Sequence, residues 1–470
     1  MPGGTLAEPM AGVLGEAAAA RPVQIVEVAA HTLSVVFPSG APPDGSDFAS
    51  LRVTAPAREV VFGRCRYHSH AGHPLRRKGD PPPAGDGRIV FLDELYDFAQ
   101  LTTTGFAFEL KKRLEQLPIL WGRKHEIRPA FRDYVAELVY DLQVYRGLFD
   151  EIDRNLEREP RVVREEVHRV VAASEYEPFC ALFDRKLAQL EELVAPFTQE
   201  EHERHGFYLR KHVWDLIRAS EFLLRTNLKP RGYAGDSEMM RMLYENDFRG
   251  STIFARFMHC HPVRTPAAQA VRNRVTLLAE QIGKLAAERP GKTLRVMSVA
   301  CGPSWELREI FRKPADLERF HVTLLDQDAS ALGEAQSVVA GIEADLGGPV
   351  TARYVRDSVR TMLRTPDLAD RWGRFSILYS MGMFDYLTAP VASAVLRRLY
   401  DLLEPGGQLV VGNFHVGCKT RRYLEYWMDW VLLYRSEDEM HALAAGLPGA
   451  SASVVFEETR SQMFLVVRKA

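Results

Sequence analysis

The sequence predicts a multidomain protein with a small N-terminal β-barrel, a central helical region and a C-terminal α/β domain. Short β-like runs dominate residues 21–100, helical periodicity dominates residues 101–245, and apolar strands alternate with helical segments over residues 246–470. A length of 470 residues suits about three domains of ordinary size. We expect the Ala- and Gly-rich residues 1–20 to be flexible.

The composition is that of a globular protein with balanced charge. Apolar residues make up 46% of the chain, charged residues make up 26%, and 60 basic side chains face 62 acidic ones. This balance indicates neither nucleic acid nor an anionic membrane as the main partner. No run reaches the roughly 18 apolar residues that an integral membrane segment needs, and the start of the chain lacks the pattern of a signal peptide. Five scattered cysteines without paired spacing indicate a reducing, cytoplasmic location.

The N-terminal runs have the length and spacing of a small β-barrel. They cover residues 23–28, 32–37, 51–53, 59–67 and 87–91. The pattern resembles a PilZ domain, in which an Arg-x-x-x-Arg and an Asp-x-Ser-x-x-Gly turn bind a nucleotide. Here Arg21 stands alone and residues 27–32 read Glu-Val-Ala-Ala-His-Thr, so the resemblance does not imply nucleotide binding. His68, His70 and His73 lack a cysteine or carboxylate partner at ligand spacing, so we expect a solvated loop and no metal.

The central region consists of amphipathic helices. Apolar residues recur at three- and four-residue steps over 131–145, 162–172, 179–193 and 207–224. The sequence leaves open whether these helices form a lid or a spacer. They end at a Pro- and Gly-rich loop, where Tyr233 and Asp236 are either placed to close over a ligand or belong to a plain interdomain turn. His259 and His261 point in different directions on a helix, which argues against a metal site.

The C-terminal domain is organised around a strand, a tight turn and a helix start at residues 293–305. The apolar run that ends at Ala300 predicts a strand covered on both faces, and Gly302 provides a turn whose following amides can face an anionic group. A second apolar strand ends at Asp326, where a carboxylate can accept hydrogen bonds from ribose hydroxyls or simply cap a helix. The turn has one glycine where a dinucleotide site has three, which argues against NAD.

The run Val299-Ala-Cys-Gly-Pro-Ser304, followed by Asp326, resembles the cofactor site of class I S-adenosylmethionine-dependent methyltransferases. Later segments resemble further strands of that Rossmann-like sheet, in order: 354–359, 375–380, the Pro-Gly-Gly turn with its strand at 402–412, and a closing hairpin at 454–456 and 463–467. The resemblance implies S-adenosyl-L-methionine as the cofactor. It also implies a set of cofactor-binding residues: Ala300, Cys301, Gly302, Pro303, Ser304, Asp326, Gln327, Asp357, Ser358, Tyr379, Ser380 and Met381.

A narrower resemblance concerns the acceptor. Residues 227–236, 265–274, 412–414 and 430–435 resemble the methyltransferases identified with synthesis of the extracellular factor 3-hydroxypalmitic acid methyl ester. It implies carboxyl methylation of a 3-hydroxy fatty acid, a small-molecule or acyl substrate. Two alternatives stay open: N-, O- or S-methylation of a secondary metabolite, and a sensor that binds the cofactor without turnover. The sequence also leaves a homodimer open.

The candidate catalytic residues follow from where such a fold places its substrate, beyond the carboxyl ends of strands four and five. From that position the candidates are Tyr379, Asp385, Tyr386, Asn413, His415, Tyr434 and Arg435. The expected catalytic set is Tyr386, His415, Tyr434 and Arg435, together with Tyr233 of the Pro- and Gly-rich loop. Among them, His415 has the ordinary pKa range of a general base, and it directly follows the fifth strand. Trp427, Trp430 and Leu433 on the neighbouring segment predict an apolar wall that suits an acyl chain or an aromatic ring.

Overall fold

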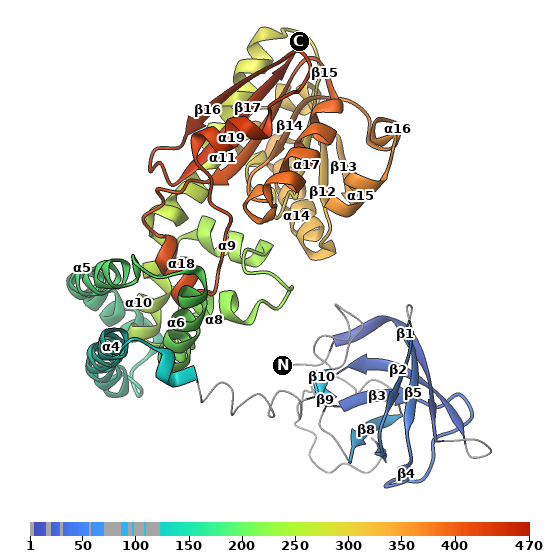
Figure 1. Ribbon diagram of the computed structural model, residues 1–470, viewed down its shortest axis with the longest axis vertical. Helices are drawn as coiled ribbons and strands as arrows, with labels where there is room; N and C mark the ends of the chain where they lie inside the picture. The colour runs from blue at the N-terminus through green and yellow to red at the C-terminus, as the bar shows by residue number, and fades with distance from the viewer. Residues whose placement is uncertain are drawn as a thin grey trace. The chain divides into compact units, whose positions relative to one another are not determined.

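A computed structural model of the chain describes residues 4–15, 20–28, 32–55, 58–69, 86–92, 96–97, 108–109 and 123–470. It contains two compact units, Met1–Glu126 and Ile127–Ala470 (Figure 1). His70, His73 and residues 29–31 of the PilZ-like comparison lie outside the described residues, as do most positions from 98 to 122.

The N-terminal unit contains an eight-stranded antiparallel sheet in the order β4-β7-β8-β3-β2-β1-β5-β6. Its strands are β1 (Gly4–Leu14), β2 (Arg21–Val28), β3 (Thr32–Val36), β4 (Asp47–Phe48), β5 (Leu51–Ala55), β6 (Arg58–Phe62), β7 (Cys65–Ser69) and β8 (Gly87–Phe91). Side chains that alternate along these strands, such as Leu33, Val35, Tyr67 and Ile89, form its buried core. A further short ladder joins β9 (Tyr96–Asp97) to β10 (Phe108–Glu109).

Two expectations for this unit change. Residues 4–14 form β1, which pairs with β2 and β5, so this part of the stretch expected to be flexible belongs to the sheet. Leu14 is fully buried in the core of the sheet, which holds the end of β1 in it. Within the described residues β4 and β6 are the edge strands, so the finding is an antiparallel sheet, and closure into a barrel stays a prediction.

The helical part of the second unit follows the predicted periodicity. The first unit ends with the short helix η3 (Arg123–Glu126). The helical elements of the second unit are α4 (Pro129–Asn155), α5 (Arg161–Val194), α6 (Gln199–His212), α7 (Trp214–Ile217), α8 (Glu221–Leu228), α9 (Ser237–Glu245) and α10 (Ile253–Val263). On α4, Phe131, Val135, Leu138 and Leu142 recur at helical spacing and are buried in one core. Thr198 begins α6 with a capping box, which satisfies two of the free amides of its first turn.

The remainder of this unit is a seven-stranded mixed sheet in the order β13-β12-β11-β14-β15-β17-β16. The strands are β11 (Leu294–Val299), β12 (Phe320–Asp326), β13 (Ala352–Arg356), β14 (Phe375–Ser380), β15 (Leu403–Phe414), β16 (Ala450–Phe456) and β17 (Gln462–Lys469). The first five are parallel, and β17 and β16 close the sheet as an antiparallel hairpin. This confirms the predicted Rossmann-like α/β fold. The chain order reverses between β11 and β14, which is where open α/β sheets bind ligands.

Helices cover both faces of this sheet (Figure 1), and each face has its own core. One core contains Met297 and Val299 of β11, together with α15 (Val359–Arg364), α16 (Leu368–Trp372), α17 (Ala389–Asp401) and α19 (Glu437–Leu443). The other contains Leu294 and Val296, together with α11 (Pro266–Glu288), α12 (Leu307–Ile310), α14 (Ala329–Leu346) and the neighbouring α13 (Ala315–Arg319). Two-sided coverage explains the near-continuous apolar run of β11.

A segment after β15 ties the helical part to the sheet part. In α18 (Arg421–Trp427), Tyr423 and Trp427 insert among the helices, and the Trp427 ring lies edge-on to that of Phe183 at 5.0 Å between centroids. The division expected between residues 245 and 246 therefore falls inside one compact unit, because residues far along the chain complete the core of the helices.

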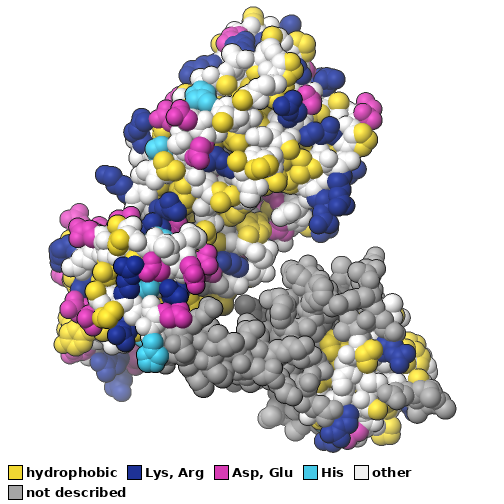
Figure 2. Space-filling view, viewed as in Figure 1, with side chains coloured by type: hydrophobic (Ala, Val, Ile, Leu, Met, Phe, Trp, Pro, Cys, Tyr) yellow, Lys and Arg dark blue, Asp and Glu magenta, His cyan; other side chains and the backbone are white. Residues whose placement is uncertain are grey.

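The described helices include none that is both long and apolar enough to cross a bilayer. Figure 2 shows acidic and basic side chains interspersed on the visible face of residues 123–470. This face presents no extended area of a single charge.

Candidate active site

A cavity of about 520 Å³ opens at the carboxyl ends of the parallel strands. It lies where the chain order of the sheet reverses, so the loops after β11 and β14 both reach it. Its lining also includes residues from the loop at 231–235, from α9 and α11, and from the segment after α18. All of the described residues that line this cavity belong to the second unit.

The loop after β11 turns through an uncommon backbone conformation. Ala300, Gly302 and Ser304 all have φ between +53° and +55°, a region that costs strain at the two residues that are not glycine. The amide of Cys301 donates to the carbonyl of Leu325 at 3.0 Å, which fixes the turn against β12. Ala300, Cys301, Gly302 and Pro303 line the cavity, whereas Ser304 is fully buried outside its lining.

The two carboxylates expected after β12 and β13 both line the cavity. Asp326 is 6% exposed, accepts hydrogen bonds from the amides of Gly302 at 3.0 Å and Asp328 at 2.9 Å, and has its pKa raised by burial. Asp357 accepts from the Ser358 amide at 3.0 Å and lies 2.7 Å from a guanidinium nitrogen of Arg371. Gln327 and Ser358 also line the cavity. The structure therefore brings these four predicted residues and the 300–303 turn together.

Of the three predicted cofactor-binding residues at the end of β14, only one lines the cavity. Met381 lines the cavity, whereas Tyr379 and Ser380 are fully buried and do not. Tyr379 packs in the core of one sheet face, and its hydroxyl donates to Oε1 of Glu306 at 3.0 Å.

Two buried charges that the sequence analysis did not single out line the same cavity. Glu306 is 6% exposed, and burial raises the pKa of its carboxyl. Arg274 on α11 is 9% exposed and donates to the Tyr244 hydroxyl and the Met381 carbonyl at 3.4 Å each. Its Nε atom has no hydrogen-bond partner among the described residues. In the sequence, Arg274 could be noticed only as a basic residue within the apolar stripe of a helix.

A group of aromatic and acidic side chains forms the other part of the lining. Trp430 donates from Nε1 to the Tyr386 hydroxyl at 2.8 Å, and Tyr233 lines the cavity beside them. Asp385 is 3% exposed, accepts from the Phe414 amide at 2.7 Å, and has its pKa raised to about 7 by burial. Burial also raises the pKa of both tyrosines, which keeps their hydroxyls protonated near neutral pH.

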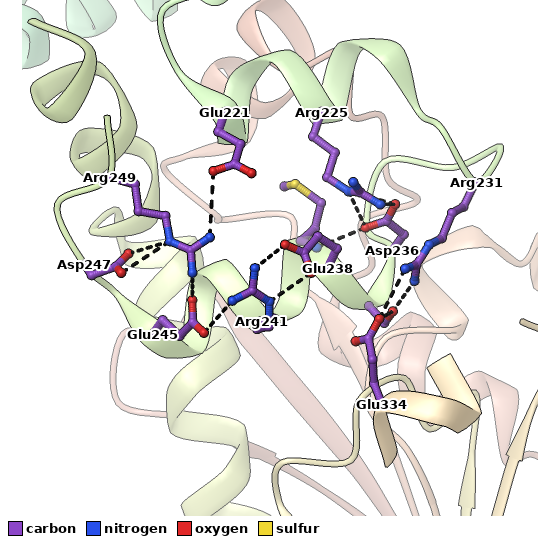
Figure 3. A network of polar contacts seen from close by, with 12 residues as sticks. Glu221, Arg225, Arg231, Asp236, Glu238, Arg241, Glu245, Asp247, Arg249 and Glu334 are labelled. Carbon is purple, nitrogen blue, oxygen red and sulfur yellow. Dashed lines mark hydrogen bonds and ion pairs between the residues drawn. The ribbon is translucent and has the colours of Figure 1, made fainter. Parts of the chain in front are cut away.

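The loop between α8 and α9 contributes Arg231, Tyr233 and Gly235 to the lining and is anchored at both ends by ion pairs (Figure 3). Asp236 caps α9 and accepts a bidentate pair from Arg225, with contacts between 2.6 and 3.0 Å. Arg231 reaches across to the sheet part, where it pairs with Asp328 and with Glu334 of α14 at 3.2 Å each. The sequence left open whether this loop closes over a ligand or is a plain interdomain turn. In the structure the loop forms one wall of the cavity.

No protein-family model matches the sequence, and no curated protein matches it. Among solved structures, a possible exported protein from Bordetella parapertussis is similar with a TM-score of 0.39 at 19% identity, over 50% of this chain and 79% of the other. Magnesium protoporphyrin IX methyltransferase from Synechocystis PCC 6803, with bound S-adenosylhomocysteine, has a TM-score of 0.34 at 14% identity, over 43% and 87%. The N-methyltransferase NodS from Bradyrhizobium japonicum WM9 has 0.30 at 13%, over 42% and 87%. At such scores a function has to be argued from the cavity itself.

Three predicted catalytic residues lie outside the cavity lining. His415 packs its ring edge-on to Phe456 at 5.2 Å between centroids, and its Nδ1 accepts from the Gly417 amide at 3.1 Å. Phe414 lines the cavity, so the next residue of the extended strand end points to the other side. The structure therefore places the His415 ring outside the cavity lining, next to Phe456.

Arg435 and Tyr434 also differ from the expectation. Arg435 is buried, donates to the carbonyl of Phe384 at 2.8 Å, and also contacts Asn413 and the carbonyl of Leu387. These contacts fix the loop after β14 from the side that does not face the cavity. The ring of Tyr434 is covered by the guanidinium of Arg421, 4.7 Å from its centroid. Neither side chain lines the cavity.

Proposed function

We propose that this protein transfers a methyl group from S-adenosylmethionine to a small-molecule acceptor bound in the same cavity. The observation that carries the proposal is a hydrogen bond that joins the Gly302 turn, beside the point where the sheet order reverses, to Asp326 at the end of β12. Asp357, in the loop after β13, lines the same cavity. The Gly302 turn and the two carboxylates, Asp326 and Asp357, are the features by which the sequence resembles class I methyltransferases.

The residues present fit the chemistry of this cofactor. Asp326 would accept hydrogen bonds from the ribose hydroxyls and Asp357 from the adenine amine, while Val359 and Met362 supply apolar lining. The amino-acid end of the cofactor carries one positive and one negative group. Glu306 would bind the positive group and Arg274 the negative group, and both side chains are buried. The Nε of Arg274 has no hydrogen-bond partner among the described residues, so it is available to donate to the carboxylate of the cofactor. When bound, the cofactor supplies an electrophilic methyl group.

The other part of the cavity supplies positioning for the acceptor. Methyl transfer needs the nucleophile aligned with the methyl carbon in a site that excludes water. Trp430, Leu432 and Phe414 form an apolar wall, and the hydroxyls of Tyr233 and Tyr386 provide polar handles. The loop at 231–235 covers this side with a backbone held by ion pairs.

Two classes of methyl acceptor are compatible with the cavity. The narrower sequence resemblance supports the carboxylate of a 3-hydroxy fatty acid, and the apolar wall suits an acyl chain. N-, O- or S-methylation of a secondary metabolite is supported by Asp385, because a buried carboxyl disfavours a second anion beside it and favours a neutral nucleophile. A sensor without turnover is the remaining candidate.

Calorimetry with S-adenosylhomocysteine, followed by transfer of labelled methyl groups to a panel of fatty acids, phenols, thiols and amines, tests the proposal. We expect tight binding and labelled product. Treatment of the product with mild base separates the classes, since esters are cleaved and N- or ether-methyl products persist. Absence of binding would overturn the proposed function, and binding without product would favour the sensor.

A further inference from the structure

Asp385 occupies an unusual position in the acceptor part of the cavity. Its side chain is 3% exposed and lines the cavity, and Oδ1 is fixed by the Phe414 amide at 2.7 Å. Its backbone carbonyl accepts from the Leu433 amide at 2.8 Å, so the residue is held at two points. Within the described residues, Oδ2 has no hydrogen-bond partner, and no cation lies within ion-pair distance of the carboxyl.

The surroundings explain why this carboxyl is free to act. The titratable or charged groups that face it come from α11, from its own loop, and from the segments after β15 and α18. They are Arg274, Tyr386, Cys418, Tyr434 and Arg435. The guanidinium of Arg435 is already engaged with Asn413 and with two backbone carbonyls. Arg274 is directed to Tyr244 and Met381.

We propose that Asp385 is the general base of the reaction and that the acceptor is therefore a hydroxyl or N–H nucleophile, which Oδ2 meets at the wall formed by Tyr386 and Trp430. This inference depends on the proposed function, because it assigns the substrate class of the same cavity. A carboxylate acceptor is already ionised and needs no base, and it would meet the charge of Asp385.

The step balances without a further reactant. A bond forms between the acceptor oxygen or nitrogen and the methyl carbon, and the carbon–sulfur bond of the cofactor breaks with its electron pair left on sulfur. The acceptor proton passes to Oδ2 of Asp385, which returns it to solvent when the product leaves. Burial raises the pKa of this carboxyl to about 7, which is the range in which a base is both ionised and basic enough near neutral pH.

A purely structural role makes a different prediction. Asp385 could serve only to hold the end of β15 through the Phe414 amide. Asp385→Asn separates the two roles, because the amide oxygen can still accept from Phe414 while the side chain can no longer take a proton. Asp345→Asn, at an exposed position of α14 outside the cavity lining, is the matched control for the same chemical change.

The experiment measures S-adenosylhomocysteine binding by calorimetry and methyl transfer to the panel of fatty acids, phenols, thiols and amines, from about pH 6 to about pH 9. We expect base-stable hydroxyl or N–H products. In Asp385→Asn we expect kcat to fall by about 10²- to 10⁴-fold with cofactor affinity and acceptor KM retained. The wild-type rise in kcat/KM through a pH of about 7 should be lost in this variant and kept in Asp345→Asn.

Two results would overturn the inference while leaving methyl transfer intact: a base-labile ester as the main product, or an unchanged pH profile in Asp385→Asn. Failure of the proposed function looks different, because S-adenosylhomocysteine would then bind to neither the wild type nor the variants, or would bind without methyl transfer to any member of the panel.

Discussion

The backbone amide of Gly302 donates a hydrogen bond to Oδ2 of Asp326 at 3.0 Å, and this bond joins the loops that follow β11 and β12. The other carboxylate oxygen accepts from the Asp328 amide at 2.9 Å, so Asp326 organises both loops at the edge of the cavity. Its position makes this carboxylate a support for the turn as well as a candidate ligand for the cofactor.

Asp326→Ala is expected to lower the affinity for S-adenosylhomocysteine by about tenfold or more, since it removes a charged acceptor from the cavity edge. It should also lower the unfolding free energy by about 1–3 kcal/mol, because two loop amides lose their partner. Calorimetry and thermal unfolding measure the two effects. Unchanged affinity in a folded variant would contradict the role given to Asp326.

Gly302→Ala is expected to weaken cofactor binding as well as stability. Its φ of +54° strains any side chain by about 1–2 kcal/mol, and the new methyl group would project where no protein atom lies within 4 Å. Gly347→Ala is a matched control, since Gly347 has φ +71°, equally open surroundings and a position outside the cavity lining. We expect both variants to lose similar stability, but only Gly302→Ala to lose affinity. Equal affinity in the two variants would argue against close approach of the cofactor to Gly302.

Arg231→Ala should speed the dissociation of S-adenosylhomocysteine by a few-fold, because the loop at 231–235 loses its ion pairs with Asp328 and Glu334. The pairs are partly exposed, so the expected effect is about 0.2–1 kcal/mol and should shrink as salt is added. Arg241→Ala is the control, since Arg241 pairs with Glu238 and Glu245 of its own helix (Figure 3). Stopped-flow displacement measures the rates. Equal rates for both variants would show that the ion pairs of Arg231 do not hold the loop closed.

Gly235→Ala is expected to push the loop away from the aromatic wall. A methyl group there would lie 2.7 Å from Cζ2 of Trp430 and 2.9 Å from the Tyr386 hydroxyl, which is closer than packed atoms approach. We expect a loss of about 1–3 kcal/mol in stability and a raised acceptor KM. Gly283→Ala, on an open face of α11, should instead raise stability by about 0.5–1 kcal/mol. A neutral Gly235→Ala variant would mean that the loop is not packed against this wall.

The pH dependence of stability reports on Asp385 without any acceptor. Its folded-state pKa of about 7 lies above the ordinary aspartate value, so the folded protein binds more protons than the unfolded chain between about pH 4 and about pH 7. The wild type should therefore lose stability relative to Asp385→Asn as pH rises through this window, by at most about 1.4 kcal/mol per pH unit. Thermal unfolding of both proteins across the window measures the difference. Parallel curves would show that Asp385 does not titrate there.

The sequence predicted the strands, their order and the residues after β11, β12 and β13, because a buried parallel strand leaves a continuous apolar run that ends where the loop begins. The position of Asp326 followed from that pattern alone. The position of the His415 side chain did not follow from its place after the fifth strand, because neighbouring residues of an extended segment point to opposite sides and Phe414 is the one that lines the cavity.

Other parts of the site could not be derived from local pattern. Glu306 and Arg274 come from separate elements and meet in the cavity only through tertiary packing, and an isolated charge in a helical stripe has no preferred interpretation. The helical part posed the same difficulty, since periodicity identifies an apolar face but not the Tyr423 and Trp427 side chains that cover it.

That packing has a consequence for how the protein is made. The helices between residues 129 and 263 bury their apolar faces against residues 414–432, which the ribosome adds some 150 residues later. During synthesis the core of the helical part therefore stays incomplete until α18 has left the ribosome. A fragment that stops before α18 would expose the surface around Phe183 and would be a natural substrate for chaperones and proteases.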